Sequence, residues 1–108
     1  MFGDRIEKES LKMKKANKQH VETLSQFFQV LSDQTRLRLL QTLQEGEQHV
    51  TELCKKLRLP QPTVSHHLGL LRMNGLVTNR RKGKLVFYSV NEDYFAEAGQ
   101  AVRAFLKV

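Results

Sequence analysis

Two adjacent histidines, His66 and His67, stand in the stretch QPTVSHHLGLLRMNGLV of residues 61–77 and are the first candidates for chemistry. Imidazole can bind a metal ion, transfer a proton or contact a DNA base. Neighbouring residues on a helix diverge by about 100°, so these rings would not share one metal as an i, i+4 pair does. No nucleophile with an orienting third group accompanies them. The pair is therefore a poor metal or catalytic site.

A helix over this stretch would have one apolar and one polar face. On a helical wheel, Val64, Leu68 and Leu71 share one side with His67 beside them, which predicts a half-buried His67. The opposite side and its flank carry short polar groups suited to the major groove, and the expected base contacts are Gln61, Thr63, Ser65 and His66. The plainer alternative is that His66 is only an exposed side chain.

Four basic residues follow within a predicted hairpin: Arg80, Arg81, Lys82 and Lys84. A protruding basic hairpin suits contact with phosphates or with the minor groove, where the potential attracts Arg and Lys. An ordinary solvated hairpin would carry the same charges for solubility. Beside a helix-turn-helix, the DNA-binding interpretation is favoured.

The elements that would position these residues follow from hydrophobic spacing. Leu24, Phe27, Phe28 and Leu31 predict a helix from Val21, and Ser32 or Asp33 is expected to cap a second helix that runs toward Gly46. A third helix is expected over 50–57, with an imperfect cap at His49, and a fourth from Gln61 to 74–75. Strands 76–80 and 84–90 would flank a turn at 81–83, and a last helix would begin at Asn91.

Length and composition limit the architecture further. A chain of 108 residues forms one domain, and 18 Lys and Arg against 11 Asp and Glu give a net charge of +7, which favours a polyanionic partner. The single cysteine, Cys54, fits a reducing compartment, and no long apolar run indicates secretion or membrane insertion, so the expected location is cytoplasmic. Residues 1–19 are expected to form a basic arm, flexible or helical, before a domain over 20–108.

Three segments together, LSDQTRLRLLQTLQEG, TELCKKL and QPTVSHHLGLLRMNGLVTNRRKGKLVFYSV, resemble the arsenic-repressor (ArsR/SmtB) family of bacterial winged-helix repressors over residues 21–108. The resemblance implies a mainly α fold with a small β-hairpin wing, a winged helix-turn-helix that dimerises through its first and last helices. It implies binding to double-stranded DNA at an inverted-repeat operator. The dimer surface that it implies comprises Leu24, Phe27, Phe28, Phe95, Val102, Phe105 and Leu106.

The metal sites of that family do not carry over to this chain. Its helix-three thiolate site has two cysteines, and here Lys56 stands in place of the second one, beside Cys54 and Lys55. One thiolate beside two ammonium groups is no soft-metal site. At the family's other site, on the last helix, the corresponding residues are Glu92, Tyr94, Phe105 and Val108, of which only the first could ligate. No metal and no cofactor are therefore expected.

The leading hypothesis is a homodimeric, sequence-specific DNA-binding repressor without the usual metal sites, and not an enzyme. A second hypothesis is a winged-helix protein-interaction module, since Pro60, Pro62 and Gly69 replace residues that in the family often contact phosphate. A third is a repressor that responds to thiol oxidation at Cys54, whose thiolate form Lys55 and Lys56 would favour. The competing view of Cys54 is a small core residue.

Overall fold

The computed structural model describes residues 21–106, so the expected arm over 1–19, together with His20 and Val108, lies outside the described residues. The first described residues, 21–31, are helical. The elements that follow are α2 (Gln34–Leu43), β1 (Gln48–His49), α3 (Val50–Leu57), α4 (Gln61–Met73), β2 (Val77–Lys82), β3 (Leu85–Val90) and α5 (Glu92–Leu106). The expected mainly α fold with a β-hairpin is confirmed.

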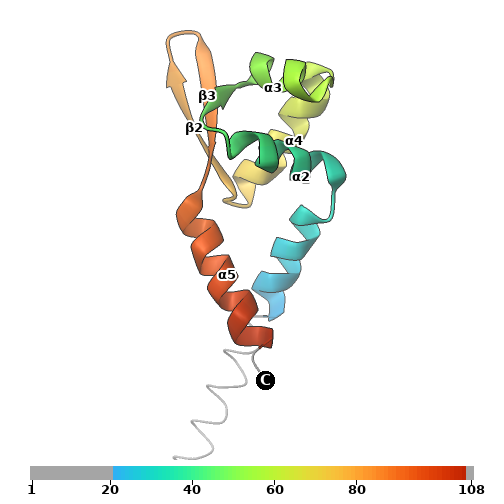
Figure 1. Ribbon diagram of the computed structural model, residues 1–108, viewed down its shortest axis with the longest axis vertical. Helices are drawn as coiled ribbons and strands as arrows, with labels where there is room; N and C mark the ends of the chain where they lie inside the picture. The colour runs from blue at the N-terminus through green and yellow to red at the C-terminus, as the bar shows by residue number, and fades with distance from the viewer. Residues whose placement is uncertain (1–20, 107–108) are drawn as a thin grey trace, which may run out of the picture.

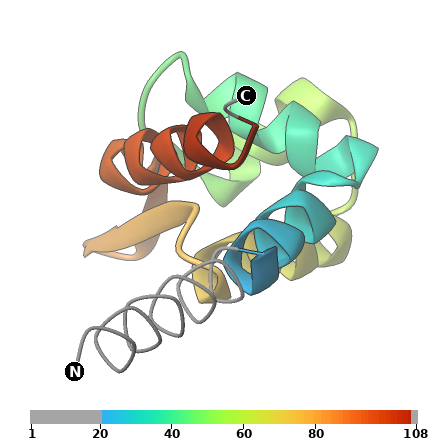
Figure 2. The same ribbon diagram turned by 90° about the horizontal axis from the view of Figure 1, so that it is seen from below.

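These elements divide the molecule into two ends (Figure 1). At one end, α2, α3 and α4 pack together beside the hairpin of β2 and β3, whose tip projects outward. The helical segment 21–31 and α5 extend toward the other end, and Phe27 joins them by aromatic contacts with Tyr94 and Phe95, each 6.0 Å between ring centroids. Seen from below, both helices lie on the near side of the molecule (Figure 2). No helix within residues 21–106 has the length and apolar character needed to cross a membrane.

A leucine core holds α2, α3 and α4 together. Leu39 of α2, Leu53 of α3 and Leu68 of α4 are each fully buried, as are Leu76 and Val64. Full burial of such a side chain stabilises the folded state by about 1.5–3 kcal/mol. Each of the three helices supplies at least one of these residues. Removing any one helix would therefore expose the apolar faces of the other two.

Hydrogen bonds at the start of α2 show which of the two candidate residues, Ser32 or Asp33, caps this helix. The backbone N–H of Arg36 donates to Asp33 Oδ1 at 3.0 Å, whereas Ser32 Oγ donates backward to the carbonyl of Gln29 at 2.7 Å. Asp33 is therefore the cap, and Ser32 ends the preceding helical segment. The bond from the Arg36 backbone is the largest cause that lowers the pKa of Asp33 below its usual value.

The sheet differs from expectation in two ways. It has three antiparallel strands in the order β1-β3-β2, and the short β1 was not expected. The expected turn at 81–83 is wrong, because β2 continues to Lys82, which pairs with Leu85 and leaves Gly83 and Lys84 as the turn. Gly83 has a φ of +63°, which suits a tight two-residue hairpin turn.

Truncation of the core is the most direct test of this packing. We expect Leu68→Ala to lower the free energy of unfolding by about 2–5 kcal/mol, because it removes a fully buried side chain and leaves a cavity. Met73→Ala on the same helix is the control, since Met73 is 83% exposed and its loss should change stability by less than about 0.5 kcal/mol. Urea unfolding followed by circular dichroism measures both, and equal effects would contradict the packing.

The cap of α2 predicts a pH dependence of stability. Because folding lowers the pKa of Asp33, its ionised form contributes stability that is present above the unfolded pKa and is lost as the pH falls through the folded pKa. Asp33→Asn keeps a capping oxygen but removes the charge. The stability difference between wild type and this variant should be present near neutral pH and shrink in acid. A difference that stays constant across that range would contradict the role of the charge.

Candidate nucleic-acid interface

Helix α4 presents the two faces that its sequence predicts. Val64, Leu68 and Leu71 have 0% exposure and fix one face against the core. Ser65 and His66 on the opposite face are exposed. Pro60 occupies the N-cap position, and Pro62 lies in the first turn, where its missing N–H costs no helical hydrogen bond. The buried leucine face thus forces the polar face outward.

The expected base contacts lie along this outward face, where Gln61 is exposed and Thr63 is half-buried. Within the described residues, the side chains of Gln61, Thr63, Ser65 and His66 have no hydrogen-bond partner, whereas Asn74, just beyond the helix, bonds the carbonyl of Leu70. Their donors and acceptors remain available to the edges of bases. Helix α4 therefore has the composition and exposure of a recognition helix.

The two histidines lie in different environments, as the helical wheel predicts. Their ring centroids are 5.2 Å apart, but His66 is exposed while the side chain of His67 is only 14% exposed. His67 Nδ1 lies 3.3 Å from the Arg36 guanidinium and 3.9 Å from Asp33 Oδ1. Arg36 Nε also donates to the carbonyl of Val30 at 2.6 Å. His67 thus connects α4 to the start of α2 and, through Arg36, to the end of segment 21–31.

The remaining candidate ligands are not gathered into a metal site. In the part of the chain that the structure describes, no group of three or more His, Cys, Asp or Glu side chains is placed to hold a metal ion. His49 instead occupies the N-cap of α3, where its backbone N–H donates to Glu52 Oε1 at 3.2 Å. The capping interaction from Glu52 therefore forms without a Ser or Thr. Cys54 is half-buried and packs against the leucine core.

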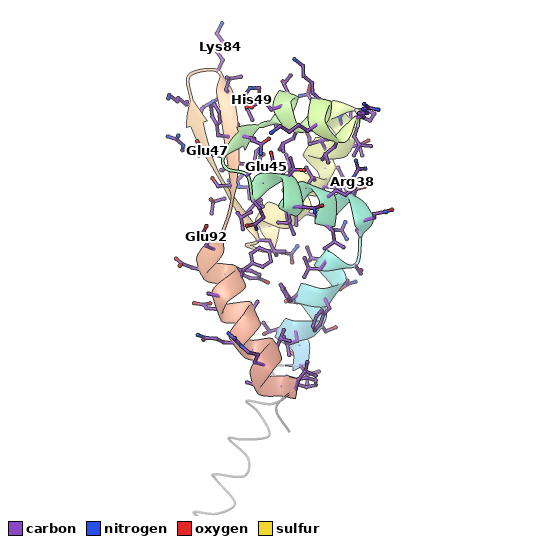
Figure 3. The ribbon with its side chains drawn as sticks, viewed as in Figure 1. Arg38, Glu45, Glu47, His49, Lys84 and Glu92 are labelled. Carbon is purple, nitrogen blue, oxygen red and sulfur yellow. The ribbon has the colours of Figure 1, made fainter. Side chains whose placement is uncertain are left out.

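The strand register divides the basic residues of the wing between two faces. Arg81 pairs with Val86 and shares a face with Tyr88 and Val90, the side that packs toward the helices. Arg80 and Lys82 lie on the other face, and Lys84 sits in the turn, where its side chain points away from the body of the protein (Figure 3). All four are exposed.

Arg80 differs from the other three wing cations because it is already paired. Its Nε and Nη2 donate to the two carboxylate oxygens of Glu47 at 2.7 and 2.6 Å. This bond is the largest cause that lowers the pKa of Glu47, and Glu47 in turn raises the pKa of Arg80. Among the described residues, Arg81, Lys82 and Lys84 have no ion-pair partner. Sequence reasoning missed Glu47, which lies 33 residues from Arg80.

A hollow lies between the wing and the start of α4, so residues of both elements line it. This cavity of about 240 Å³ lies between the hairpin tip and the starts of α3 and α4, and it is lined by His49, Val50, Thr51, Gln61, Lys84, Leu85 and Val86. Gln61 and Lys84, expected from the sequence as a base contact and a phosphate contact, therefore line the same depression. Thr51 also lines this hollow, although the sequence did not suggest it, because only the position of α3 against the hairpin places it there.

Two packed helices, the second with a free polar face, followed by a basic hairpin define a class of protein. This arrangement is a winged helix-turn-helix, in which the second helix enters the major groove and the hairpin lies beside it.

Comparison with known proteins narrows the class to a family. Residues 33–79 match the family model for bacterial regulatory proteins of the arsR family. The chain is 41% identical over 78 residues to the arsenical resistance operon repressor of Escherichia coli, an alignment that covers 71% of this chain and 67% of that protein. It is 42% identical over 81 residues to a biofilm growth-associated repressor of Xylella fastidiosa, covering 75% and 68%. The chain belongs to the arsR family of transcriptional regulators.

Solved structures agree with this assignment. Reduced HlyU from Vibrio cholerae matches with a TM-score of 0.69 and 27% identity, covering 85% of this chain and 98% of that one. HlyU from Vibrio vulnificus matches with a TM-score of 0.67 and 32% identity, covering 84% and 96%. The family consists of DNA-binding regulators and not of enzymes.

Proposed function

We propose that this protein is a homodimeric transcriptional repressor that reads an inverted-repeat operator with α4 and holds the DNA backbone with its wing. The observation that carries the proposal is the free polar face of α4 beside the free cations of the hairpin. The repressors among its relatives support the regulatory role.

The proposal assigns different work to the two elements. Gln61, Thr63, Ser65 and His66 read base edges in the major groove, where Gln pairs with adenine and short hydroxyl side chains approach closely. Arg81, Lys82 and Lys84 bind phosphates, which fixes the register of the protein without distinguishing sequences. Preference for an operator therefore resides in α4, and most of the affinity resides in the wing.

A dimer is supported by apolar surface on the first and last helices. Phe28, Phe105 and Leu106 are more than half exposed, an unusual state for side chains that gain from burial. Phe95 and Val102 are half-buried, whereas Leu24 and Phe27 are buried within the chain and support the pair of helices from inside. Two copies joined through this surface would place their α4 helices in successive major grooves about 34 Å apart.

The proposed repressor does not rely on the metal sites of its family. Lys56 stands in place of the second cysteine, and its ammonium group, which cannot ligate a soft metal, pairs with Glu45 at 3.1 Å. On α5, Glu92 is the one ligating side chain among the corresponding described positions. Cys54 is half-buried in the core, which favours a packing role over the alternative of a redox switch.

Two substitutions test the division of work between α4 and the wing. His66→Ala should lower the preference for the operator by up to about 1–3 kcal/mol, because it removes one base contact. Arg81→Gln should weaken binding to every duplex and reduce the slope of log K against log salt by about 0.9, because it removes one phosphate contact. Fluorescence anisotropy across a salt series, on a duplex from upstream of its own gene and on a scrambled duplex, measures both.

Three outcomes would contradict the proposal. If both variants lost affinity equally on both duplexes, the two elements would not differ in role. If wild type bound the two duplexes alike and released both at moderate salt, net charge alone would explain binding. If wild type bound neither duplex, the protein-interaction module would become the better account.

The dimer surface makes a separate prediction. Phe105→Glu should convert the dimer to a monomer in sedimentation velocity and lower operator affinity, because a monomer reaches only one half-site. Met73→Glu, the same kind of change at the highly exposed end of α4, is the control and should remain dimeric. A wild-type protein that sediments as a monomer at micromolar concentration would contradict the dimer.

A further inference from the structure

The structure assigns Glu47 a role in DNA binding that the proposed function does not include: we infer that its carboxylate takes the place of a DNA phosphate on Arg80. Glu47 would then weaken the grip of the wing on DNA of any sequence. The inference rests on the proposed function, since it concerns how strongly the same wing holds the same backbone.

The geometry of the pair is that of phosphate recognition. An arginine binds a phosphate or a carboxylate through a fork of two parallel N–H donors. In Arg80 such a fork, Nε with Nη2, is occupied by the two oxygens of Glu47 at 2.7 and 2.6 Å. A phosphate that approached this edge of the guanidinium would have to displace the carboxylate.

The fold holds both partners in place. Glu47 immediately precedes β1, Arg80 lies in β2, and β3 runs between the two strands. The side chain of Arg80 therefore reaches across the central strand, where Ser89 Oγ lies 3.5 Å from Glu47 Oε2 (Figure 3 labels Glu47 beside the hairpin). Strand pairing holds Arg80 opposite Phe87 and holds Gln48, the residue next to Glu47, opposite Tyr88, so the backbone on each side brings the two side chains within reach of each other.

The carboxylate of Glu47 weakens DNA binding even if Arg80 leaves Glu47 to bind a phosphate. An exposed ion pair is weak, so a phosphate could recruit Arg80. The carboxylate of Glu47 would then have lost its partner and would repel the negatively charged DNA backbone. In either arrangement, Glu47 reduces what Arg80 would otherwise contribute to binding.

This arrangement has a use in a protein of net charge +7. Phosphate contacts strengthen binding to every sequence alike, and a genome offers a vast excess of non-operator sites. An acid that cancels one wing cation lets the protein leave such sites sooner. The base contacts proposed for α4 should be unaffected, because Glu47 lies in the loop before β1 and not on that helix.

The test is Glu47→Gln, assayed by anisotropy on operator and scrambled duplexes across a salt series. Freeing Arg80 should steepen the slope of log K against log salt by up to about 0.9, which near 0.1 M salt corresponds to binding about five- to tenfold tighter on both duplexes. Glu45→Gln is the matched control. It makes the same change of charge two residues away, where Glu45 pairs with Lys56 of α3 instead of the wing, and it should have a much smaller effect.

Arg80→Gln completes the test. In the wild-type background it should cost far less affinity than Arg81→Gln, and in combination with Glu47→Gln it should abolish most of the gain. Unchanged or weaker binding by Glu47→Gln, a gain equal to that of Glu45→Gln, or a gain that survives in the double variant would each overturn the inference. Those results leave wild-type operator binding intact, so they are distinct from failure of the proposed function, in which wild type binds neither duplex and both ideas fall.

Discussion

The burial of one face of α4 is the constraint on which the rest of the structure depends. Val64, Leu68 and Leu71 lock that face into a core shared with α2 and α3. Because Ser65 and His66 lie on the side of the helix opposite the buried face, this burial leaves them in solvent. The exposed polar face of α4 is thus a consequence of packing, and any loss of packing would rotate or release the side chains that we propose read DNA.

A polar network links this core to the helices at the other end of the molecule. Arg36 bonds the carbonyl of Val30 and lies beside His67, while Asp33 caps α2 through the backbone of the same arginine. Three segments of the chain thereby meet around one guanidinium. Through these contacts Arg36 ties the start of α2 to the end of the helical segment 21–31 and to His67 of α4.

The wing follows a different principle, in which charge and not packing decides what each residue can do. Its hairpin is short, β2 is exposed toward the tip, and its four cations look equivalent in the sequence. The strand register places these cations on two faces of the hairpin, and Glu47 neutralises one cation, Arg80. The number of basic residues in a hairpin is therefore an upper bound on the number that are free to hold a phosphate backbone.

The sequence by itself determined the helices, the two faces of α4, the half-buried His67 and the family, because periodic burial and helix caps are local patterns. Tertiary structure alone decided the short β1, the contact of His67 with Arg36 and the Arg80–Glu47 pair. The two contacts join residues that are 31 and 33 positions apart in the chain. Such contacts leave no local pattern. The turn was mislocated for a related reason: Arg81 and Lys82 are typical of loops as well as edge strands, and only pairing with β3 shows where the strand ends.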